Sequence, residues 1–175
     1  MPRAGPGVEP KSCSAEFRDR LVVITGATSG IGYATAEKYA SRGAELLCIN
    51  RNEDKSKAVC DELTEKYGTS CEYLIADLSL MAEVHRVAGK LLEVNRPIDV
   101  FIHNAGIYST ERRLTSEGIQ TVFAVNYLSS FVLNYLLKEK IRSQGRGKIL
   151  LVNSEGHRFA VWGLRLDDLL WEKRW

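Results

Sequence analysis

The residues best suited to chemistry lie in a glycine-rich turn, Thr25-Gly26-Ala27-Thr28-Ser29-Gly30-Ile31-Gly32. The turn follows an apolar run, Leu21 to Thr25, and precedes a stretch of helical character, Ile31 to Arg42. Glycine allows a tight turn and a close backbone approach, and the free N–H groups and positive dipole end of a helix attract an anion. This order of strand, turn and helix predicts a loop that binds the pyrophosphate of a dinucleotide through Gly26, Thr28, Ser29, Gly30, Ile31 and Gly32.

Other residues that matter below stand where later apolar runs end, or inside an apolar stretch. They are Asp77 and Leu78 after the third run, Asn104, Ala105 and Gly106 after the fourth, Ser154 after the fifth, and Asn126 within Ile119 to Leu137. Each also has an ordinary structural interpretation. Asp77 could cap the helix that begins near Leu80, Asn104 could belong to a strand-ending turn, and Ser154 could be a loop hydroxyl. An asparagine inside an apolar helix is costly unless its amide is hydrogen-bonded.

These residues sit on a repeating pattern of short apolar runs and longer stretches of helical periodicity. The runs are Leu21 to Thr25, Glu45 to Ile49, Cys71 to Ala76, Ile98 to His103 and Lys148 to Asn153; the expected helices are Ile31 to Arg42, Asp54 to Tyr67, Ala82 to Val94 and Ser116 to Ser143. Such alternation is typical of βαβ units. It predicts an α/β fold, a doubly wound parallel sheet with helices on both faces.

The composition fits one globular domain. The chain has 175 residues, 45% of them hydrophobic, with a formal net charge of +2 and charges that are scattered rather than clustered. Nucleic acid is therefore not expected as a partner. Residues 1–17, rich in proline and glycine at their start, are expected to form a flexible leader, and residues 18–175 one domain.

The cysteines and histidines show no metal-binding spacing. Cys13, Cys48, Cys60 and Cys71 contain no C-x-x-C pair, so no metal site and a reduced, cytoplasmic protein are expected. The uncharged stretch Ile119 to Leu137 carries several polar residues, which favours a buried core helix over a transmembrane segment. Peripheral association with a membrane is left open.

The motifs resemble those of the short-chain dehydrogenase/reductase family in identity and in order. The glycine spacing is Gly-x-x-x-Gly-x-Gly, and Asp77-Leu78, His103-Asn104-Ala105-Gly106, Asn126-Tyr127 and Val152-Asn153-Ser154 follow. The similarity covers Arg20 to His157 and implies a Rossmann-type, NAD(P)-binding domain. It also implies that Asp77 contacts adenine, that Asn126 opens its helix and anchors a water in a proton relay, and that Ser154 holds the substrate oxygen. An unrelated doubly wound domain would not explain Asn104-Ala105-Gly106 together with Asn126.

Cofactor choice is predicted from the end of the second run. NAD usually meets an acidic side chain there, whereas a 2′-phosphate needs that acid absent and a cation nearby. Asn50 occupies the expected acid position and Arg51 follows it, so NADP is favoured over NAD. The alternative for Arg51 is a solvated surface residue, and the nearby Glu53 and Asp54 weaken the case for NADP.

The end of the sequence resembles the retinol-dehydrogenase-like branch of the family. The resemblance rests on Ser154 to His157 and Leu166 to Leu169, and it implies a small apolar carbonyl or alcohol as substrate. Family chemistry also uses a Tyr-x-x-x-Lys pair after the serine, in which the lysine lowers the pKa of the tyrosine. None of the seven tyrosines is followed four residues later by lysine, so the sequence resembles a family domain that ends before this motif and lacks its last strands.

Three interpretations follow, and the sequence does not choose between them. The sequence could stop short of the whole domain, the chain could be a short isoform, or it could be a cofactor-binding protein without catalysis. In each case the fifth strand is expected at a sheet edge, and the helix over Ser116 to Ser143 is expected to expose an apolar face. A homo-oligomer or a protein partner would cover that face.

Overall fold

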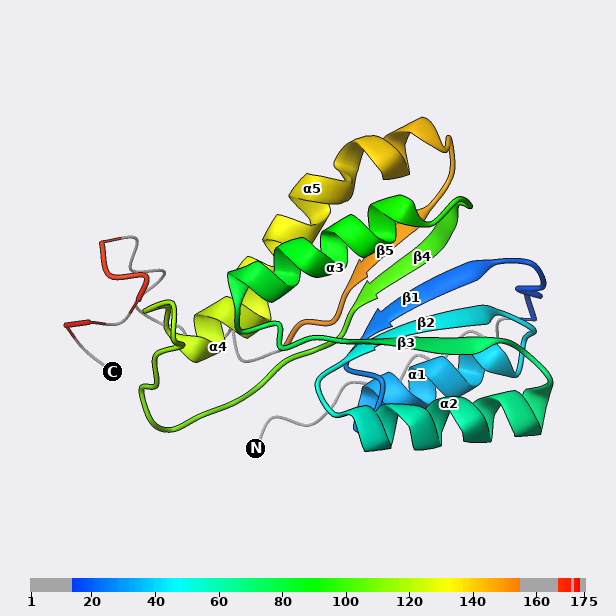
Figure 1. The fold of residues 1–175 in the computed structure, drawn as a ribbon, viewed down its shortest axis with the longest axis horizontal. Helices are drawn as coiled ribbons and strands as arrows, with labels where there is room; N and C mark the ends of the chain where they lie inside the picture. Colours follow the sequence, from blue (N-terminus) through cyan, green and yellow to red (C-terminus); the bar gives the residue numbers. More distant parts are fainter. Residues whose placement is uncertain (1–13, 155–166, 171, 174–175) are drawn as a thin grey trace, which may run out of the picture.

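The computed structural model describes residues 14–154, 167–170 and 172–173, and it contains a five-stranded parallel sheet. The strands are β1 (Leu21–Thr25), β2 (Glu45–Asn50), β3 (Cys71–Ile75), β4 (Ile98–His103) and β5 (Lys148–Leu151), in the spatial order β3-β2-β1-β4-β5 (Figure 1). The chain winds outward from β1 to β3 and then returns to place β4 on the other side of β1. The carboxyl ends of β1 and β4 therefore form a topological switch point, where open α/β sheets bind ligands.

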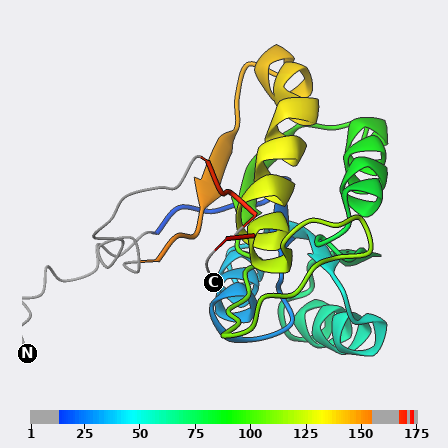
Figure 2. The ribbon, with the colours of Figure 1, turned by 90° about the vertical axis from the view of Figure 1, so that its left-hand side faces the viewer.

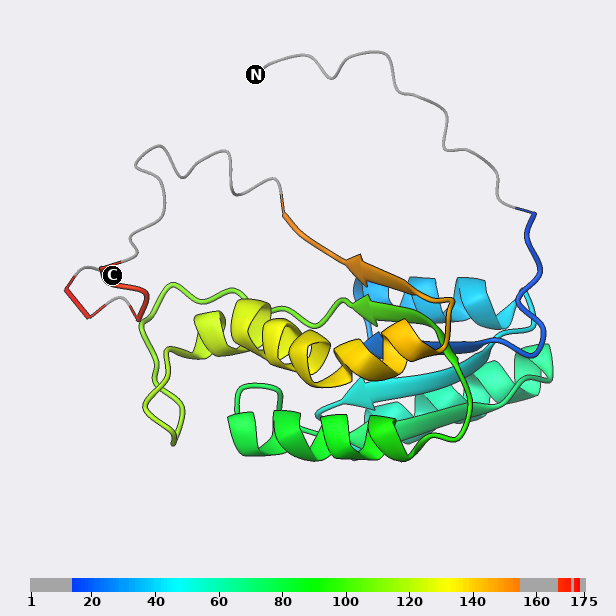
Figure 3. The ribbon, with the colours of Figure 1, turned by 90° about the horizontal axis from the view of Figure 1, so that it is seen from above.

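Helices cover both faces of the sheet, which confirms the predicted fold class. On one face lie α1 (Gly30–Ala40) and α2 (Glu53–Tyr67), and on the other α3 (Met81–Glu93) and α5 (Ser129–Ser143) (Figure 1). The alternation of side chains along a strand explains this arrangement. Val22 and Ile24 of β1 pack in the cluster under α1 and α2, whereas Leu21 and Val23 pack in the cluster under α3 and α5. Figure 3 shows α3 and α5 running side by side over their face.

The long helix, predicted over Ser116 to Ser143, differs from the prediction both in where it starts and in its helical geometry. It begins at Thr121 rather than Ser116, and it consists of α4 (Thr121–Phe123), a π-helical turn η1 (Ala124–Leu128) and α5. Residues 115–119 form a turn instead, in which Thr115 N donates to Ile119 O and Gly118 N donates to Thr115 O. Gln120 ends that turn by capping the helix, since its Oε1 accepts from Phe123 N at 2.6 Å. The interior Gly118 at φ +76° favours a turn over a helix.

The fifth strand lies at the edge of the sheet, as expected, and is shorter than predicted. It ends at Leu151 rather than Asn153, it pairs with β4, and all four of its residues are exposed. Figure 2 shows β5 at the side of the sheet away from α2 and α3. Three aromatic side chains of the neighbouring helix are also more than half exposed, namely Tyr127 (55%), Phe131 (54%) and Tyr135 (60%). The predicted exposed helix face is therefore confirmed for the described residues.

The last residue of the predicted leader, Phe17, contacts residues at the end of α1 and just after it. Phe17, which the sequence assigned to the leader, donates its N–H to Arg42 O at 2.8 Å and packs edge-on against Tyr39 with ring centroids 4.8 Å apart. Residues 1–13 of the predicted leader lie outside the described residues. No helix within the described part of the chain combines the length and the apolar character needed to cross a membrane.

Candidate functional site

A cavity of about 410 Å³ opens at the switch point, above the carboxyl ends of β1 to β4. Its lining brings together the predicted cofactor residues from four loops. These are Gly26, Thr28, Ser29, Ile31, Gly32, Arg51, Asp77, Leu78, Asn104, Ala105 and Gly106. Gly30, the remaining predicted residue, is not in the lining, and its left-handed φ of +55° shapes the turn. The fold therefore gathers motifs that lie up to 80 residues apart into one site.

Two glycines of the first loop are required by close packing as well as by backbone geometry. Gly26 has a φ of +70°, and a Cβ there would lie 3.0 Å from the Cα of Ala105. A Cβ on Gly32 would overlap the carbonyl oxygen of Gly26 and the side-chain nitrogen of Asn104. Asn104 Nδ2 itself donates to Gly26 O at 2.9 Å and to Thr25 O at 3.1 Å. Glycine at these two positions thus lets the loop pack closely against Asn104 and Ala105 at the edge of the cavity.

The amino terminus of α1 faces this cavity. Ser29 is the N-cap residue in extended conformation, and within the described chain its side chain makes no capping hydrogen bond. The first N–H groups of a helix have no intrahelical acceptor, so those of the first turn of α1 are available to an anion. Gly32 and Ile31 of that turn line the cavity. An open cradle with amide donors fits a pyrophosphate.

Thr25 is a residue of this region that the sequence analysis missed. Its buried Oγ1 accepts from two backbone donors of the loop after β4, Asn104 N at 3.0 Å and Ala105 N at 2.9 Å. The hydroxyl therefore fixes the ends of β1 and β4 to each other. The signal in the sequence was a buried polar residue at the last position of an apolar strand, which alone does not reveal its partners.

Asn50 supports the glycine-rich loop from the end of β2. It is 4% exposed, and its Oδ1 accepts from Ala27 N at 2.8 Å. Its Nδ2 is buried at the cavity and has no hydrogen-bond partner among the described residues. An orphaned donor of this kind is costly in water-free protein, so it fits a ligand acceptor. The exposed Arg51 lines both this cavity and an adjoining one of about 520 Å³.

Asp77 does not cap α3. Its Oδ1 accepts from Ser79 N at 2.9 Å, in a local turn that leaves the residue in the cavity lining. The N-cap position of α3 is Leu80, and the first turn is satisfied from a distance by Glu117, whose carboxylate accepts from Met81 N at 2.6 Å and Ala82 N at 3.1 Å. The capping role considered for Asp77 thus belongs to Glu117.

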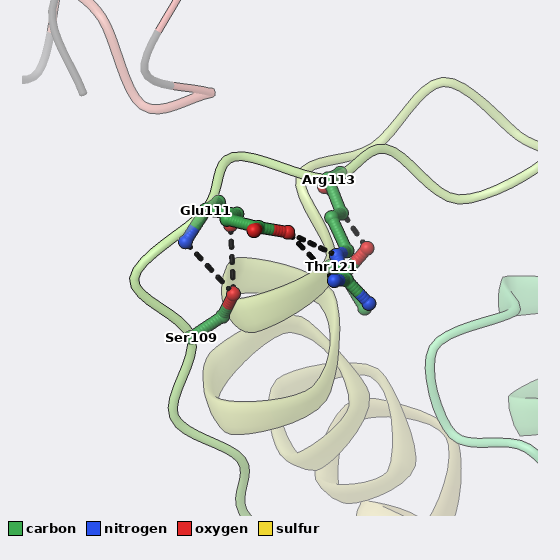
Figure 4. A network of polar contacts seen from close by, with 4 residues as sticks. All are labelled: Ser109, Glu111, Arg113 and Thr121. Atoms are coloured by element: carbon green, nitrogen blue, oxygen red, sulfur yellow. Dashed lines mark hydrogen bonds and ion pairs between the residues drawn. The ribbon is translucent and has the colours of Figure 1, made fainter.

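The loop after β4 is held by its own polar contacts. Figure 4 shows Ser109 bonded to the backbone of Glu111, Glu111 paired with Arg113 at 2.6 Å, and Thr121 Oγ1 donating to Arg113 O. Asn126 anchors the start of this loop, because its Oδ1 accepts from Ile107 N at 2.8 Å and its Nδ2 donates to Ile107 O at 2.9 Å. The amide of Asn126 is therefore satisfied, and the helix is widened to a π turn at this residue, as the family resemblance implied.

A smaller cavity of about 310 Å³ lies between β4, β5 and the long helix. It shares Ala105 and Val125 with the cofactor cavity, and Asn126, Val152 and Asn153 also line it. Ser154 follows Asn153 directly and is exposed, but it is not in the lining of either cavity. The structure therefore places Asn126 in the lining of the smaller cavity, beside the residues that the two cavities share. Ser154 is the residue after Asn153, the last lining residue of that cavity.

His103 faces α5 from the last position of β4. Its Nε2 lies 2.9 Å from Asn134 Oδ1, and its ring lies 4.1 Å from that of Phe101. Burial lowers its pKa, opposed by the hydrogen bond with Asn134. A buried neutral imidazole in these contacts stabilises the packing of α5 against the sheet.

Three of the four cysteines meet in the structure, which their spacing did not predict. The sulfur atoms of Cys48, Cys60 and Cys71 lie within 4.8 Å of one another. They come from β2, α2 and β3, and none of them lines the cofactor cavity. Only the tertiary fold brings them together.

The family of the chain follows from this fold and site. The family model described as short chain dehydrogenase matches residues 20–163, so the chain belongs to the short-chain dehydrogenase/reductase family of oxidoreductases. Its relatives confirm the retinol-dehydrogenase-like branch. Human retinol dehydrogenase 13 is 29% identical over 163 residues, which cover 91% of this chain and 48% of that protein. Human WW domain-containing oxidoreductase is 35% identical over 146 residues, covering 83% and 35%. The chain thus spans less than half the length of these relatives.

Solved structures agree with this membership. A short-chain dehydrogenase from Sphingobium yanoikuyae in complex with NADPH is 31% identical and superposes with a TM-score of 0.73, covering 82% of this chain and 57% of that one. L-sorbose reductase from Gluconobacter frateurii, complexed with NADPH and L-sorbose, is 26% identical with a TM-score of 0.73, covering 84% and 57%.

Proposed function

We propose that this chain binds NADPH in the switch-point cavity, as the cofactor-binding part of an NADP-dependent oxidoreductase that acts on a carbonyl or alcohol group of an apolar substrate. The observation that carries the proposal is the open glycine cradle at the amino terminus of α1, with Arg51 at the rim of the same cavity. The NADPH complexes of two structural relatives support it.

Different groups of residues contact different parts of the cofactor. The amides at Gly30 to Gly32 and the side chains of Thr28 and Ser29 hold the pyrophosphate. Asp77 and Leu78 contact the adenine side, and Asn104, Ala105 and Gly106 border the path toward the nicotinamide.

Arg51 selects NADPH over NADH by pairing with the 2′-phosphate, since no carboxylate occupies the end of β2. Asn50 is neutral and already accepts a hydrogen bond from the glycine-rich loop, so it does not repel a phosphate.

Asn126 and Ser154 act at the nicotinamide end of the cofactor, where the substrate reacts. The bound nicotinamide supplies or accepts the hydride in this family's chemistry. Asn126 holds the loop at Ile107 beside the cavity and, by the family resemblance, anchors a relay water. Ser154 donates to the substrate oxygen. No tyrosine of the 175 residues has lysine at the fourth following position, so we expect this chain to bind NADPH without turnover at enzymatic rates.

A second candidate is a non-catalytic module that holds NADPH or binds a protein partner. The observation that favours it is the exposed aromatic row of the long helix, where Phe123 and Tyr127 stack at 5.3 Å between centroids and Tyr127 and Phe131 at 6.0 Å. A self-associating chain or a partner would cover this row.

One experiment tests the cofactor assignment and the expected absence of turnover. NADPH and NADH are titrated into the 175-residue chain by calorimetry, and NADPH oxidation is followed with a panel of apolar aldehydes and ketones. Tight NADPH binding with weaker NADH binding supports the cofactor assignment. Failure to bind either cofactor would contradict it. Binding without turnover is the result expected of these 175 residues, and turnover at an enzymatic rate would contradict that expectation by showing that the residues present suffice for catalysis.

A further inference from the structure

A cluster of three thiols lies on the face of the sheet that α1 and α2 cover, apart from the cofactor cavity. Cys60 Sγ is 2.7 Å from Cys71 Sγ, and Cys48 Sγ is 4.0 Å from Cys71 Sγ. Cys60 belongs to α2 and Cys71 is the first residue of β3, so the closest pair joins two elements that are adjacent in the chain and packed in space. Cys48 and Cys60 are buried, whereas Cys71 is only partly covered.

We propose that Cys60 and Cys71 form an oxidisable dithiol, a modification site at which a peroxide converts the two thiols into a disulfide that ties α2 to β3. A disulfide places its sulfurs about 2.05 Å apart, so the pair needs an approach of only about 0.7 Å. The third thiol, Cys48, lies farther from Cys71 and stays reduced.

A metal ion is the competing occupant of three clustered thiols, and the structure favours the disulfide. Thiolates around zinc, with bonds of about 2.3 Å, stand roughly 3.8 Å apart, so Cys60 and Cys71 would have to separate by about 1 Å. The group holds three ligands, and no fourth cysteine, histidine or acidic residue among those the structure describes joins it. The surroundings are apolar, with Val59 and Leu63 in the same cluster, and they accommodate a neutral disulfide better than a charged metal-thiolate group.

The cluster supplies the reactive form of the thiol. Hydrogen bonds from Cys48 and Cys71 lower the pKa of Cys60 to about 4, while the hydrogen bond with Cys60 raises the pKa of Cys48. These hydrogen bonds favour the thiolate form of Cys60. The thiolate is the nucleophile in cysteine oxidation, and a low-pKa thiol beside a second thiol is the arrangement that redox-active pairs share.

The reaction balances with hydrogen peroxide as oxidant. The Cys60 thiolate attacks one peroxide oxygen, forming an S–O bond and breaking the O–O bond, and the departing hydroxide takes a proton to become water. The Cys71 sulfur then attacks the sulfur of the Cys60 sulfenic acid, forming the S–S bond and breaking the S–O bond. The second hydroxide takes the Cys71 proton and leaves as water. Two thiols lose two electrons in total, and the peroxide gains them.

The experiment oxidises the reduced 175-residue chain with hydrogen peroxide, blocks remaining thiols with an alkylating reagent, and maps disulfides by digestion and mass spectrometry. We expect loss of two thiols, a peptide linked through Cys60 and Cys71, and recovery of both thiols with a reductant. The Tm of the oxidised chain is expected to rise by several degrees, because the disulfide lowers the conformational entropy of the unfolded chain.

Matched variants make the result specific. Cys60→Ser and Cys71→Ser each abolish the linked peptide, whereas Cys48→Ser and Cys13→Ser leave it in place; Cys13, outside the described residues, is the control for cysteine content. Cys60→Ala serves if the serine variant fails to fold. Oxidation that stops at a sulfinic acid, or a link that includes Cys48, would overturn the proposal. So would stoichiometric zinc in the purified chain that protects the thiols. NADPH affinity is measured in parallel, so failure here is distinguishable from failure of the cofactor site.

Discussion

The strand ends around the proposed cofactor cavity and the β5 edge of the sheet differ in how far the described residues bury them. The strands β1, β2 and β4 are largely buried, and the loops at their ends are joined by Asn50, Asn104 and Thr25 through specific hydrogen bonds. Around β5 the strand is exposed, and the aromatic side chains of the long helix lie open to solvent. The proposed cofactor site therefore rests on contacts that the described residues already make, whereas β5 and the aromatic row of the long helix are left exposed among them.

The largest expected effect comes from closing the cradle on the nucleotide side. Gly32→Ala should reduce NADPH affinity by at least about 100-fold, a loss of roughly 2.7 kcal/mol, because the added Cβ would displace Gly26 and Asn104. Isothermal titration measures the change. Gly89→Ala is the control, since a Cβ there meets nothing within 4 Å and alanine favours the helix. If Gly32→Ala and Gly89→Ala lose the same NADPH affinity, the loss does not come from the glycine-rich loop.

The next effect tests cofactor choice. Arg51→Ala should weaken NADPH binding by about 10- to 100-fold and leave NADH binding nearly unchanged, because only the 2′-phosphate needs the guanidinium. The control is Arg113→Ala, a neighbouring cation that lines the adjoining cavity and is paired with Glu111 at 2.6 Å. If both cofactors weaken equally in the Arg51 variant, Arg51 does not read the 2′-phosphate.

A smaller effect tests the tie between β1 and β4. Thr25→Ala should lower the free energy of unfolding by about 2 kcal/mol, because two backbone donors lose their acceptor in a buried place. Thr25→Ser keeps the hydroxyl and should recover most of this loss. Urea denaturation gives the values. An alanine variant as stable as the wild type would mean that water or a shifted loop satisfies Asn104 and Ala105.

The smallest effect concerns the side of α5 and depends on pH. Burial lowers the pKa of His103 in the folded chain, so the unfolded chain takes up the proton more readily. The associated stability is present above the unfolded pKa of about 6.5 and is lost as the pH falls below it. Urea denaturation should show a steeper loss on acidification for the wild type than for His103→Gln. The exposed His85→Asn variant is the control and should follow the wild type. If the free energy of unfolding depends on pH in the same way in all three chains, His103 does not contribute to that dependence.

Much of the fold was predictable because it depends on local patterns, and the site beyond the glycine-rich loop was predictable because its motifs resemble those of a known family. Apolar runs mark strands, and the glycine loop, Asp77 and the Asn104 motif each follow a run at a strand end. The boundary at Ser116 was wrong because Gly118 favours a turn, and the alternative in which Asp77 caps the helix does not hold because Glu117, 40 residues away, supplies the cap. The first competition is local, whereas the second joins residues too far apart in the sequence for any one window to contain both.

The sequence by itself determined the strands, the order of the motifs and the family, since periodicity and motif spacing are properties of the chain. Only the tertiary structure decided which distant groups meet. Thr25 with the loop after β4, Asn126 with Ile107, and the three thiols of Cys48, Cys60 and Cys71 depend on how strands align and which way their side chains point. Those contacts arise from packing between segments, and spacing along the chain carries no record of them.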